Sequence, residues 1–352
     1  MRQRKEKSLS SSPAAAAGRG AGAPAVCAVK MRNDDVDPRS RWSAAATTCT
    51  CLPPADNRDG VRSRSLTHLL SQNLFIERTF VLCIITHKST ISDSESMKLN
   101  DVSLSDRFTK GTGRVLANGT QALLISMFRQ RRFDRARGFN TAGFLSGYRG
   151  SPIASLDSEA ERAAKHLAAH DITFTPGINE DLALTSVWGT QQVALDPMAR
   201  VDGVFGMWYG KGAGLDRCGD ALRHAHGAGT SPQGGVLVVC GDDHALKSSS
   251  QAYHSEPTFI DMQMPVLAPA DLQDILDFSI LGWEMSRFSG CYVGFKALAE
   301  HVNSTGLLDV GLDRISLAEL ERPQQNDRWI RWPDPWPDVE KRLLNIKLPA
   351  AL

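Results

Sequence analysis

The sequence lacks any pairing of cysteines that would build a disulfide framework or a structural metal site. Its 352 residues contain seven cysteines, and none of them forms a CxxC pair. This spacing argues against a disulfide scaffold, a structural zinc site and a cysteine-ligated iron–sulfur cluster within the chain. We therefore expect reduced thiols and a cytoplasmic protein.

Excess charge and long apolar runs are also missing. The formal net charge is +1, so electrostatics offer no reason to expect a nucleic acid or a membrane surface as a partner. No apolar stretch approaches the roughly 20 residues that a membrane-spanning helix needs. With 42% hydrophobic and 22% charged residues, the composition is that of an ordinary globular protein.

The two ends of the chain differ in composition from its middle. Residues 1–96 are rich in Pro, Ala, Ser and Arg and show no persistent period, so they bury too little apolar surface to fold. We predict a disordered leader or a start codon assigned too early, with Met97 as the true start. The Arg-rich beginning also resembles an organelle transit peptide. Residues 306–352 are expected to be a connector to a missing domain.

Between about Val115 and Leu298, apolar runs alternate with amphipathic segments. This alternation predicts an α/β fold, a mostly parallel sheet with helices on both faces. The expected strands lie in TAGFLSGY, DITFTPGI, VDGVFGMWYG, GGVLVVCGDD, MPVLAPA and CYVGFKAL. The expected helices cover residues 120–132, 155–170, 180–195, 216–227 and 271–287.

Four loops follow these strands and carry most of the polar residues of interest. They read SGYRGSP, PGINED, GKGAGLDRCGD and GDDHALKSSSQAYHSE. In an open parallel sheet, ligands bind beyond the carboxyl ends of the strands. The four loops are therefore predicted to converge on one edge of the sheet.

Each loop, taken alone, also has a purely structural interpretation. GYRGSP suits a strand-to-helix turn, with Gly150 supplying backbone freedom and Ser151 a cap. The glycine-rich loop around Gly212 precedes a helix and suits either a tight turn or a phosphate site, although it lacks the P-loop and GxGxxG spacings. Asp242 and Asp243, followed by His244, suit turn bonding better than metal ligation.

One acidic residue falls on the predicted inner face of a helix. Asn179 is a good N-cap, and the helix that follows it presents an apolar stripe. The stripe contains Leu184, Val187, Trp188 and Leu195, with Gln191 as a polar member, and Glu180 lies on the same side. Glu180 is therefore either a functional acid or a favourable charge at a helix start.

Taken together, the motifs resemble one family. GFLSGYRGSPIASLDSE, FTPGINEDLALTSVWGTQ, GMWYGKGAGLDRCGDALRHAH and VVCGDDHALKSSSQAYHSE look like the N-terminal part of the long indolepyruvate ferredoxin oxidoreductases, of the 2-oxoacid:ferredoxin oxidoreductase group. The resemblance covers about Leu99 to Val310. It departs from the family pattern near Ala213, Ala245 and His226.

The resemblance implies that residues 97–305 are a pyrimidine-binding domain for thiamine diphosphate. It assigns Glu180 the catalytic role, in which its carboxylate bonds the ring nitrogen of the aminopyrimidine para to the amine-bearing carbon. Tyr148 and Arg149 would face the substrate. A structural salt bridge would explain Arg149 equally well. The residues implied to contact the cofactor are Glu180, Gly150, Ser151, Pro152, Asn179 and Gly212.

The implied reaction is oxidative decarboxylation of an aryl-pyruvate, a 2-oxoacid, to an acyl-coenzyme A, with electrons passing to ferredoxin. The chain contains no GDG-type motif for magnesium and diphosphate. Mg²⁺ and the iron–sulfur clusters are therefore expected on missing domains or subunits. The chain alone should be inactive, and the assembly should be a homodimer.

Two other functions stay open at this stage. The same pyrimidine-binding half occurs in non-oxidative thiamine-diphosphate decarboxylases and carboligases. The chain also suits an orphaned domain that binds or assembles without catalysis. The sequence does not reveal the preferred 2-oxoacid.

Overall fold

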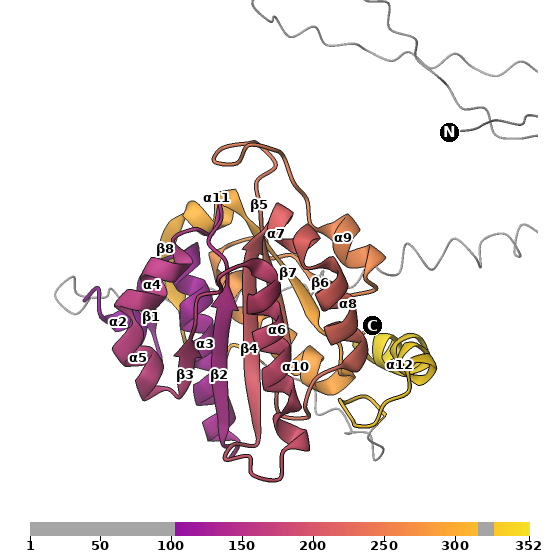
Figure 1. Cartoon of the computed structure of the whole chain (residues 1–352). Helices are drawn as coiled ribbons and strands as arrows, with labels where there is room; N and C mark the ends of the chain where they lie inside the picture. The colour runs from indigo at the N-terminus through magenta and orange to yellow at the C-terminus, as the bar shows by residue number, and fades with distance from the viewer. Residues whose placement is uncertain (1–102, 316–326) are drawn as a thin grey trace, which may run out of the picture. The chain divides into compact units, whose positions relative to one another are not determined.

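The computed structural model describes residues 103–315 and 327–352 (Figure 1). The predicted leader, residues 1–96, lies outside this part of the chain. The core is a six-stranded parallel sheet in the order β3-β2-β4-β5-β7-β6. Its strands are β2 (Thr141–Gly147), β3 (Ile172–Phe174), β4 (Gly203–Lys211), β5 (Val236–Asp242), β6 (Val266–Leu267) and β7 (Val293–Leu298). All six predicted strands are present, and the predicted α/β fold class is confirmed.

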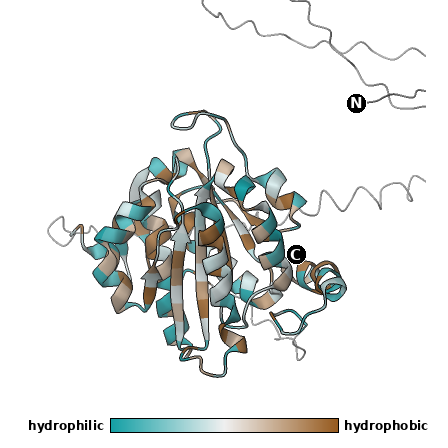
Figure 2. Cartoon of the chain, in the orientation of Figure 1, coloured by the Kyte–Doolittle hydropathy of each residue, from teal (hydrophilic) through white to brown (hydrophobic). Residues whose placement is uncertain are grey.

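Helices cover both faces of the sheet. The sheet separates two hydrophobic cores. The larger core contains residues of α3 and α10, and the smaller core contains residues of α6 and α8. Helices α6 and α8 lie on the near side of the sheet in Figure 1. Hydrophobic residues fill the strands, whereas the outer helix surfaces are hydrophilic (Figure 2). The helices are α2 (Asp106–Thr109), α3 (Gly119–Ala136), α4 (Leu156–Arg162), α5 (Ala164–Ala169), α6 (Glu180–Thr190), α7 (Gly212–Arg217), α8 (Gly219–Ala228), α9 (Glu256–Asp261), α10 (Leu272–Ser289) and α11 (Ala299–Asn303).

Strand β5 shows why the sheet is buried on both sides. Leu237 and Val239 belong to the larger core, whereas Val236, Val238 and Cys240 belong to the smaller one. Successive side chains of a strand point to opposite faces, so a continuous apolar run is suited to a strand with helices on both sides.

Two further strands were not predicted. β1 (Arg114–Asn118) pairs antiparallel with β8 (Thr305–Asp309) as a separate two-stranded sheet. The expected boundary between residues 305 and 306 falls inside β8. Arg129 on α3 donates to the carbonyl of Gly311, just after β8, at 2.7 Å. It also pairs with Asp277 on α10 at 3.0 Å.

The helix predicted over 180–195 is shorter than expected. α6 ends at Thr190 and is followed by a 3-10 turn, η2 (Gln191–Leu195). The predicted inner position of Leu195 is wrong, because the change of pitch leaves this side chain 40% exposed. The turn is held by the buried Gln191 amide, which donates to the Val204 carbonyl at 2.8 Å and accepts from Gly235 N at 3.1 Å.

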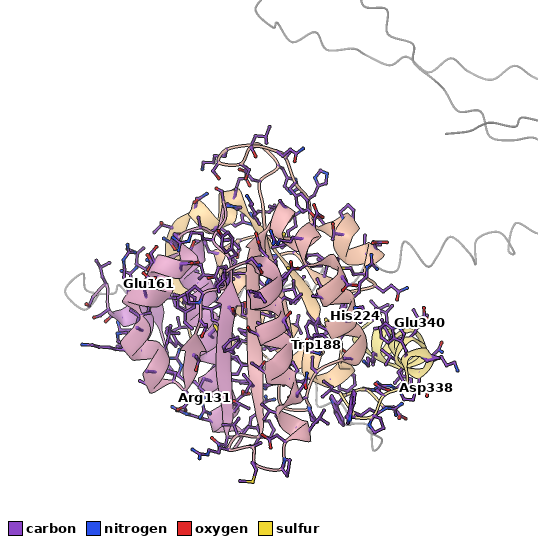
Figure 3. All side chains as sticks on the ribbon, in the orientation of Figure 1. Arg131, Glu161, Trp188, His224, Asp338 and Glu340 are labelled. Atoms are coloured by element: carbon purple, nitrogen blue, oxygen red, sulfur yellow. The ribbon has the colours of Figure 1, made fainter. Side chains whose placement is uncertain are left out.

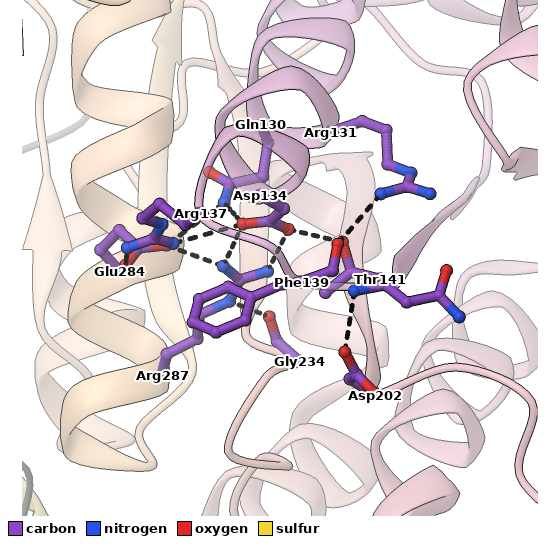
Figure 4. A network of polar contacts seen from close by, with 11 residues as sticks. Gln130, Arg131, Asp134, Arg137, Phe139, Thr141, Asp202, Gly234, Glu284 and Arg287 are labelled. Carbon is purple, nitrogen blue, oxygen red and sulfur yellow. Dashed lines mark hydrogen bonds and ion pairs between the residues drawn. The ribbon is translucent and has the colours of Figure 1, made fainter.

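A buried ionic network ties α3 to α10 (Figure 4). Asp134 on α3 is fully buried and accepts two hydrogen bonds from Arg287 on α10, at 2.6 and 2.8 Å. Thr141 at the start of β2 donates a third at 2.6 Å. Burial alone would raise the pKa of Asp134, but the contacts with Arg287 outweigh it and lower the pKa below its ordinary value.

The C-terminal segment packs against α8 and α10. It contains α12 (Trp336–Arg342), the π-helical turn η3 (Leu343–Lys347) and α13 (Leu348–Ala351). The Trp329 indole donates to the Arg287 carbonyl at 2.7 Å. Trp336 stacks on His224 of α8, with ring centroids 5.1 Å apart, and Figure 3 shows His224 beside the helix that carries Asp338 and Glu340. Across the described residues, no helix is both long enough and apolar enough to cross a membrane.

Candidate functional site

The loops predicted to converge do meet beyond the carboxyl ends of the strands. Tyr148 N, after β2, donates to the Tyr209 carbonyl of β4 at 3.1 Å. Gly177 N, after β3, donates to the Gly147 carbonyl of β2 at 2.8 Å. The loop that follows β5 rises above this edge in Figure 1, and its Ser248 hydroxyl bonds the hydroxyl of Ser151.

Glu180 lies where the β3 and β4 loops meet. It is the first residue of α6, and Asn179 caps the helix by accepting from Leu182 N at 2.8 Å. Glu180 is only 8% exposed. Its backbone is fixed by the fully buried Trp208, whose indole donates to the Glu180 carbonyl at 3.1 Å. The predicted inward orientation of this acid is confirmed.

Helix α7 borders the Glu180 carboxyl group from two directions. Gly214 packs so closely that a Cβ added there would lie 2.8 Å from Glu180 Cγ and 3.0 Å from Oε1. Arg217 Nε lies 3.9 Å from Glu180 Oε2 and 3.2 Å from Asp181 Oδ2. No hydrogen bond to the Glu180 carboxylate is found among the described residues, so a nearly buried acid keeps its bonding capacity free.

A buried thiol lies near these acids and is kept unreactive. Cys218, after α7, is fully buried. Burial first, and then the charges of Asp181 and Glu180, raise the pKa of the Cys218 thiol well above its ordinary value. The thiol therefore stays protonated at neutral pH, and thiolate chemistry is excluded at this position.

The two predicted substrate residues lie at the surface of this edge. Tyr148 is 38% exposed, and the Arg149 side chain is 73% exposed. Arg149 Nε is 3.8 Å from Asp157 Oδ2, while the other oxygen of Asp157 accepts from the Tyr209 hydroxyl at 2.7 Å. The contact between Arg149 and Asp157 is loose, so the guanidinium keeps free donors.

The predicted cofactor residues of the GYRGSP loop are spread over its length. Gly150 packs on the aliphatic part of the Lys211 side chain, 2.9 Å from where its Cβ would stand. Pro152 is buried, and its ring touches the position of a Cβ on Gly241 at 2.8 Å. Ser151 lies between them with its hydroxyl bonded to Ser248.

Gly212 is covered by an aromatic ring that sequence reasoning missed. A Cβ on Gly212 would lie 2.0 Å from ring atoms of Tyr253, which belongs to the loop between β5 and α9. The Tyr253 hydroxyl donates to Asp216 Oδ1 at 2.7 Å. Glycine is required at position 212 for this close approach. Nothing local in the sequence links Tyr253 to Gly212.

Asp242 and Asp243 shape the loop after β5. Asp242 is fully buried and accepts from both the backbone N and the hydroxyl of Ser255, at 2.9 Å each. Burial raises the pKa of Asp242. Asp243 accepts from Lys247 N at 2.9 Å and Ser248 N at 2.7 Å. Both aspartates thus act as turn acceptors.

Three side chains around Asp242 complete its surroundings. Lys296 Nζ and His244 Nε2 each lie 3.8 Å from Asp242 Oδ2, and Lys296 also pairs with Glu256. The part of the chain that the structure describes contains no group of three or more His, Cys, Asp or Glu residues arranged to hold a metal ion.

Comparison with known proteins gives a distant relative. No protein-family model matches the chain. It is 25% identical over 169 residues to the indolepyruvate oxidoreductase subunit IorA of Methanothermobacter thermautotrophicus. That match covers 48% of this chain and 25% of the relative, so the chain spans about a quarter of the relative's length.

A solved structure is also similar in part. It is the 2-oxoglutarate:ferredoxin oxidoreductase from Magnetococcus marinus with 2-oxoglutarate, coenzyme A and succinyl-CoA bound. The TM-score is 0.42 at 17% identity, over 56% of this chain and 31% of the other. By sequence, about half of the chain is therefore similar to part of an indolepyruvate oxidoreductase subunit.

Proposed function

We propose that this chain is the pyrimidine-binding part of a thiamine-diphosphate-dependent indolepyruvate ferredoxin oxidoreductase. The observation that carries the proposal is Glu180, a carboxylate 8% exposed at the carboxyl edge of a parallel sheet, without a hydrogen bond among the described residues. Its one ion-pair contact among the described residues is with Arg217 Nε, 3.9 Å from Glu180 Oε2. A ligand that forms a hydrogen bond with this carboxyl group would use bonding capacity that the chain leaves free.

The surroundings of Glu180 fit an aminopyrimidine ring. Its backbone is held by Trp208 and the Asn179 cap, so the start of α6 is fixed before a ligand arrives. Because the side chain is only 8% exposed, a hydrogen bond between this carboxyl group and a ring nitrogen would compete little with water. When bound, thiamine diphosphate supplies a carbon nucleophile for the ketone of a 2-oxoacid. Glu180 would hold the proton at the ring nitrogen para to the amine-bearing carbon.

The exposed loop after β2 would serve the substrate. Arg149 is 73% exposed and only loosely paired with Asp157 at 3.8 Å, so it can turn toward the carboxylate of a 2-oxoacid and bind it through two donors. Tyr148 lies next to it and offers an aromatic face. Gly150, Ser151 and Pro152 would line the same side, and Asn179 and Gly212 would border the cofactor through the loops that carry them.

The remaining parts of the reaction belong to partners. The chain has no GDG-type motif, so Mg²⁺ and the diphosphate would be held by another domain or subunit in a homodimeric assembly. The complete enzyme would oxidise the 2-oxoacid, release carbon dioxide, transfer the acyl group to coenzyme A and pass two electrons through iron–sulfur clusters to ferredoxin. This chain alone would be inactive.

Ligand-observed NMR of thiamine diphosphate with the purified chain tests the proposal. We expect a dissociation constant on the order of millimolar, about 4 kcal/mol of binding, because the diphosphate contacts are absent. Glu180→Gln should weaken binding about tenfold or more, the scale of a lost hydrogen bond to a charged group. Glu161→Gln, an exposed glutamate of α4 labelled in Figure 3, should change nothing. Equal binding by Glu180→Gln and the parent would contradict the proposal.

A further inference from the structure

Tyr253 holds helix α7 at two points. Its ring lies against Gly212, the first residue of α7, where a Cβ would stand 2.0 Å from the ring. Its hydroxyl donates to Asp216 Oδ1 at 2.7 Å and lies 3.0 Å from Thr258 Oγ1 of α9. One side chain therefore ties both ends of a six-residue helix to the loop after β5.

The part of α7 between and beyond these points forms the wall beside Glu180. Gly214 lies between the two contacts, and its Cβ position is 2.8 Å from Glu180 Cγ. Arg217 follows Asp216 and places Nε 3.9 Å from Glu180 Oε2. A shift of α7 would therefore change both the space and the charge next to the Glu180 carboxyl group.

The start of helix α7 has no side-chain cap of its own, and the Tyr253 ring packs against it. Its N-cap, Lys211, makes no side-chain capping hydrogen bond. Such a short helix gains little stability from its backbone alone. Tyr253 is itself well placed, because Ser255, two positions on, is bonded twice to the fully buried Asp242.

We propose that Tyr253 is a positioning residue for Glu180, which it acts on through α7. The catalytic meaning of this role rests on the proposed function, whereas the mechanical link between Tyr253 and Glu180 does not. Through this link, the loop after β5 is connected to the acid at the start of α6. The same loop also bonds the GYRGSP loop through Ser248 and Ser151.

NMR of the labelled full chain tests the link without any ligand. The readouts are the side-chain carboxyl ¹³C signal of Glu180, amide exchange in α7 and the melting temperature. Tyr253→Phe keeps the ring and removes the bond to Asp216, so α7 amides should exchange about tenfold faster, as expected for a lost hydrogen bond to a charged group. The Glu180 carboxyl signal should move by more than its line width.

Two further variants control for general effects. Asp216→Ala removes the same hydrogen bond from its exposed acceptor side and should cause the same changes in amide exchange and in the Glu180 signal. The double variant should show no larger effect than either single variant, because both substitutions break one contact. Tyr292→Phe removes a buried hydroxyl that has no partner among the described residues, and it should leave the Glu180 signal unchanged.

The outcomes separate this inference from the proposed function. A lower melting temperature with an unmoved Glu180 signal would show a merely structural tyrosine and overturn the inference. If Tyr253→Phe moves the Glu180 signal but Glu180→Gln leaves thiamine diphosphate binding unchanged, the inference holds and the proposed function is rejected.

Discussion

Lys347 makes the stability of this protein depend on pH in a definite direction. The side chain is fully buried in η3, and its one hydrogen bond among the described residues goes to the Gly227 carbonyl near the end of α8, at 2.5 Å. Burial, followed by the positive charges of Arg342 and Arg331, lowers the pKa of Lys347 from its ordinary 10.5 to about 7. The nearby Cys291 thiol opposes this only weakly, since burial raises its own pKa to about 11.

The sign follows from proton counting. Between pH 7 and 10.5 the unfolded chain holds a proton on Lys347 that the folded chain has released, so stability rises with pH across this window. The slope approaches about 1.4 kcal/mol per pH unit, and its onset near pH 7 is gradual. We expect a gain of about 2 kcal/mol between pH 7 and 9, with little change from this residue below about pH 6.

Urea unfolding of the parent and of Lys347→Met, followed by tryptophan fluorescence, measures this effect. The methionine variant keeps the length of the side chain, so it should lose the pH-dependent gain. It should also be at least as stable as the parent at pH 7, because no charge need be desolvated. Equal pH slopes for the two proteins would refute the reasoning, since they would show that Lys347 stays charged when folded.

Two other predictions concern packing. Arg287→Met removes the partner of a fully buried Asp134 and should cost about 3–5 kcal/mol in urea unfolding; a loss under about 1 kcal/mol, the scale of a surface pair, would mean that Thr141 and Arg137 suffice to hold the acid. Gly214→Ala places a Cβ 2.8 Å from Glu180 Cγ and should cost about 1–3 kcal/mol by overpacking. Gly189→Ala, near the C-terminal end of α6 and with nothing within 4 Å, should instead stabilise α6 by about 0.5–1 kcal/mol, and a similar loss for both would contradict the close-packing argument.

The parallel sheet was predictable chiefly because β5 is apolar through its middle. Val236 to Cys240 face two cores in alternation, and few structures other than a doubly covered strand accommodate such a run. β1 and β8 escaped prediction because they are short and partly exposed, as Leu116 at 40% and Leu307 at 55% show. Their pairing joins residues at opposite ends of the domain, which no local pattern reveals.

The inward position of Glu180 followed from helical periodicity, because Leu184 and Val187 lie one and two turns on and are both buried. The same periodicity failed at Leu195, where Gln191 bonds three backbone groups and changes the helix to a 3-10 turn. The Tyr253 tie was beyond sequence reasoning, since it depends on a ring reaching Gly212 across two loops.

The most direct test of the central claim measures Glu180 in the complete enzyme. The chain would be combined with a partner domain that holds Mg²⁺ and the diphosphate, and hydrogen–deuterium exchange at the thiazolium carbon of thiamine diphosphate would be followed without substrate. Glu180→Gln should still bind the cofactor in this assembly but slow the exchange about 10²-fold or more, the scale of losing a positioned proton-transfer group. An exchange rate within about twofold of the parent, far short of that loss, would contradict the account and leave Glu180 as an ordinary acid at a helix start.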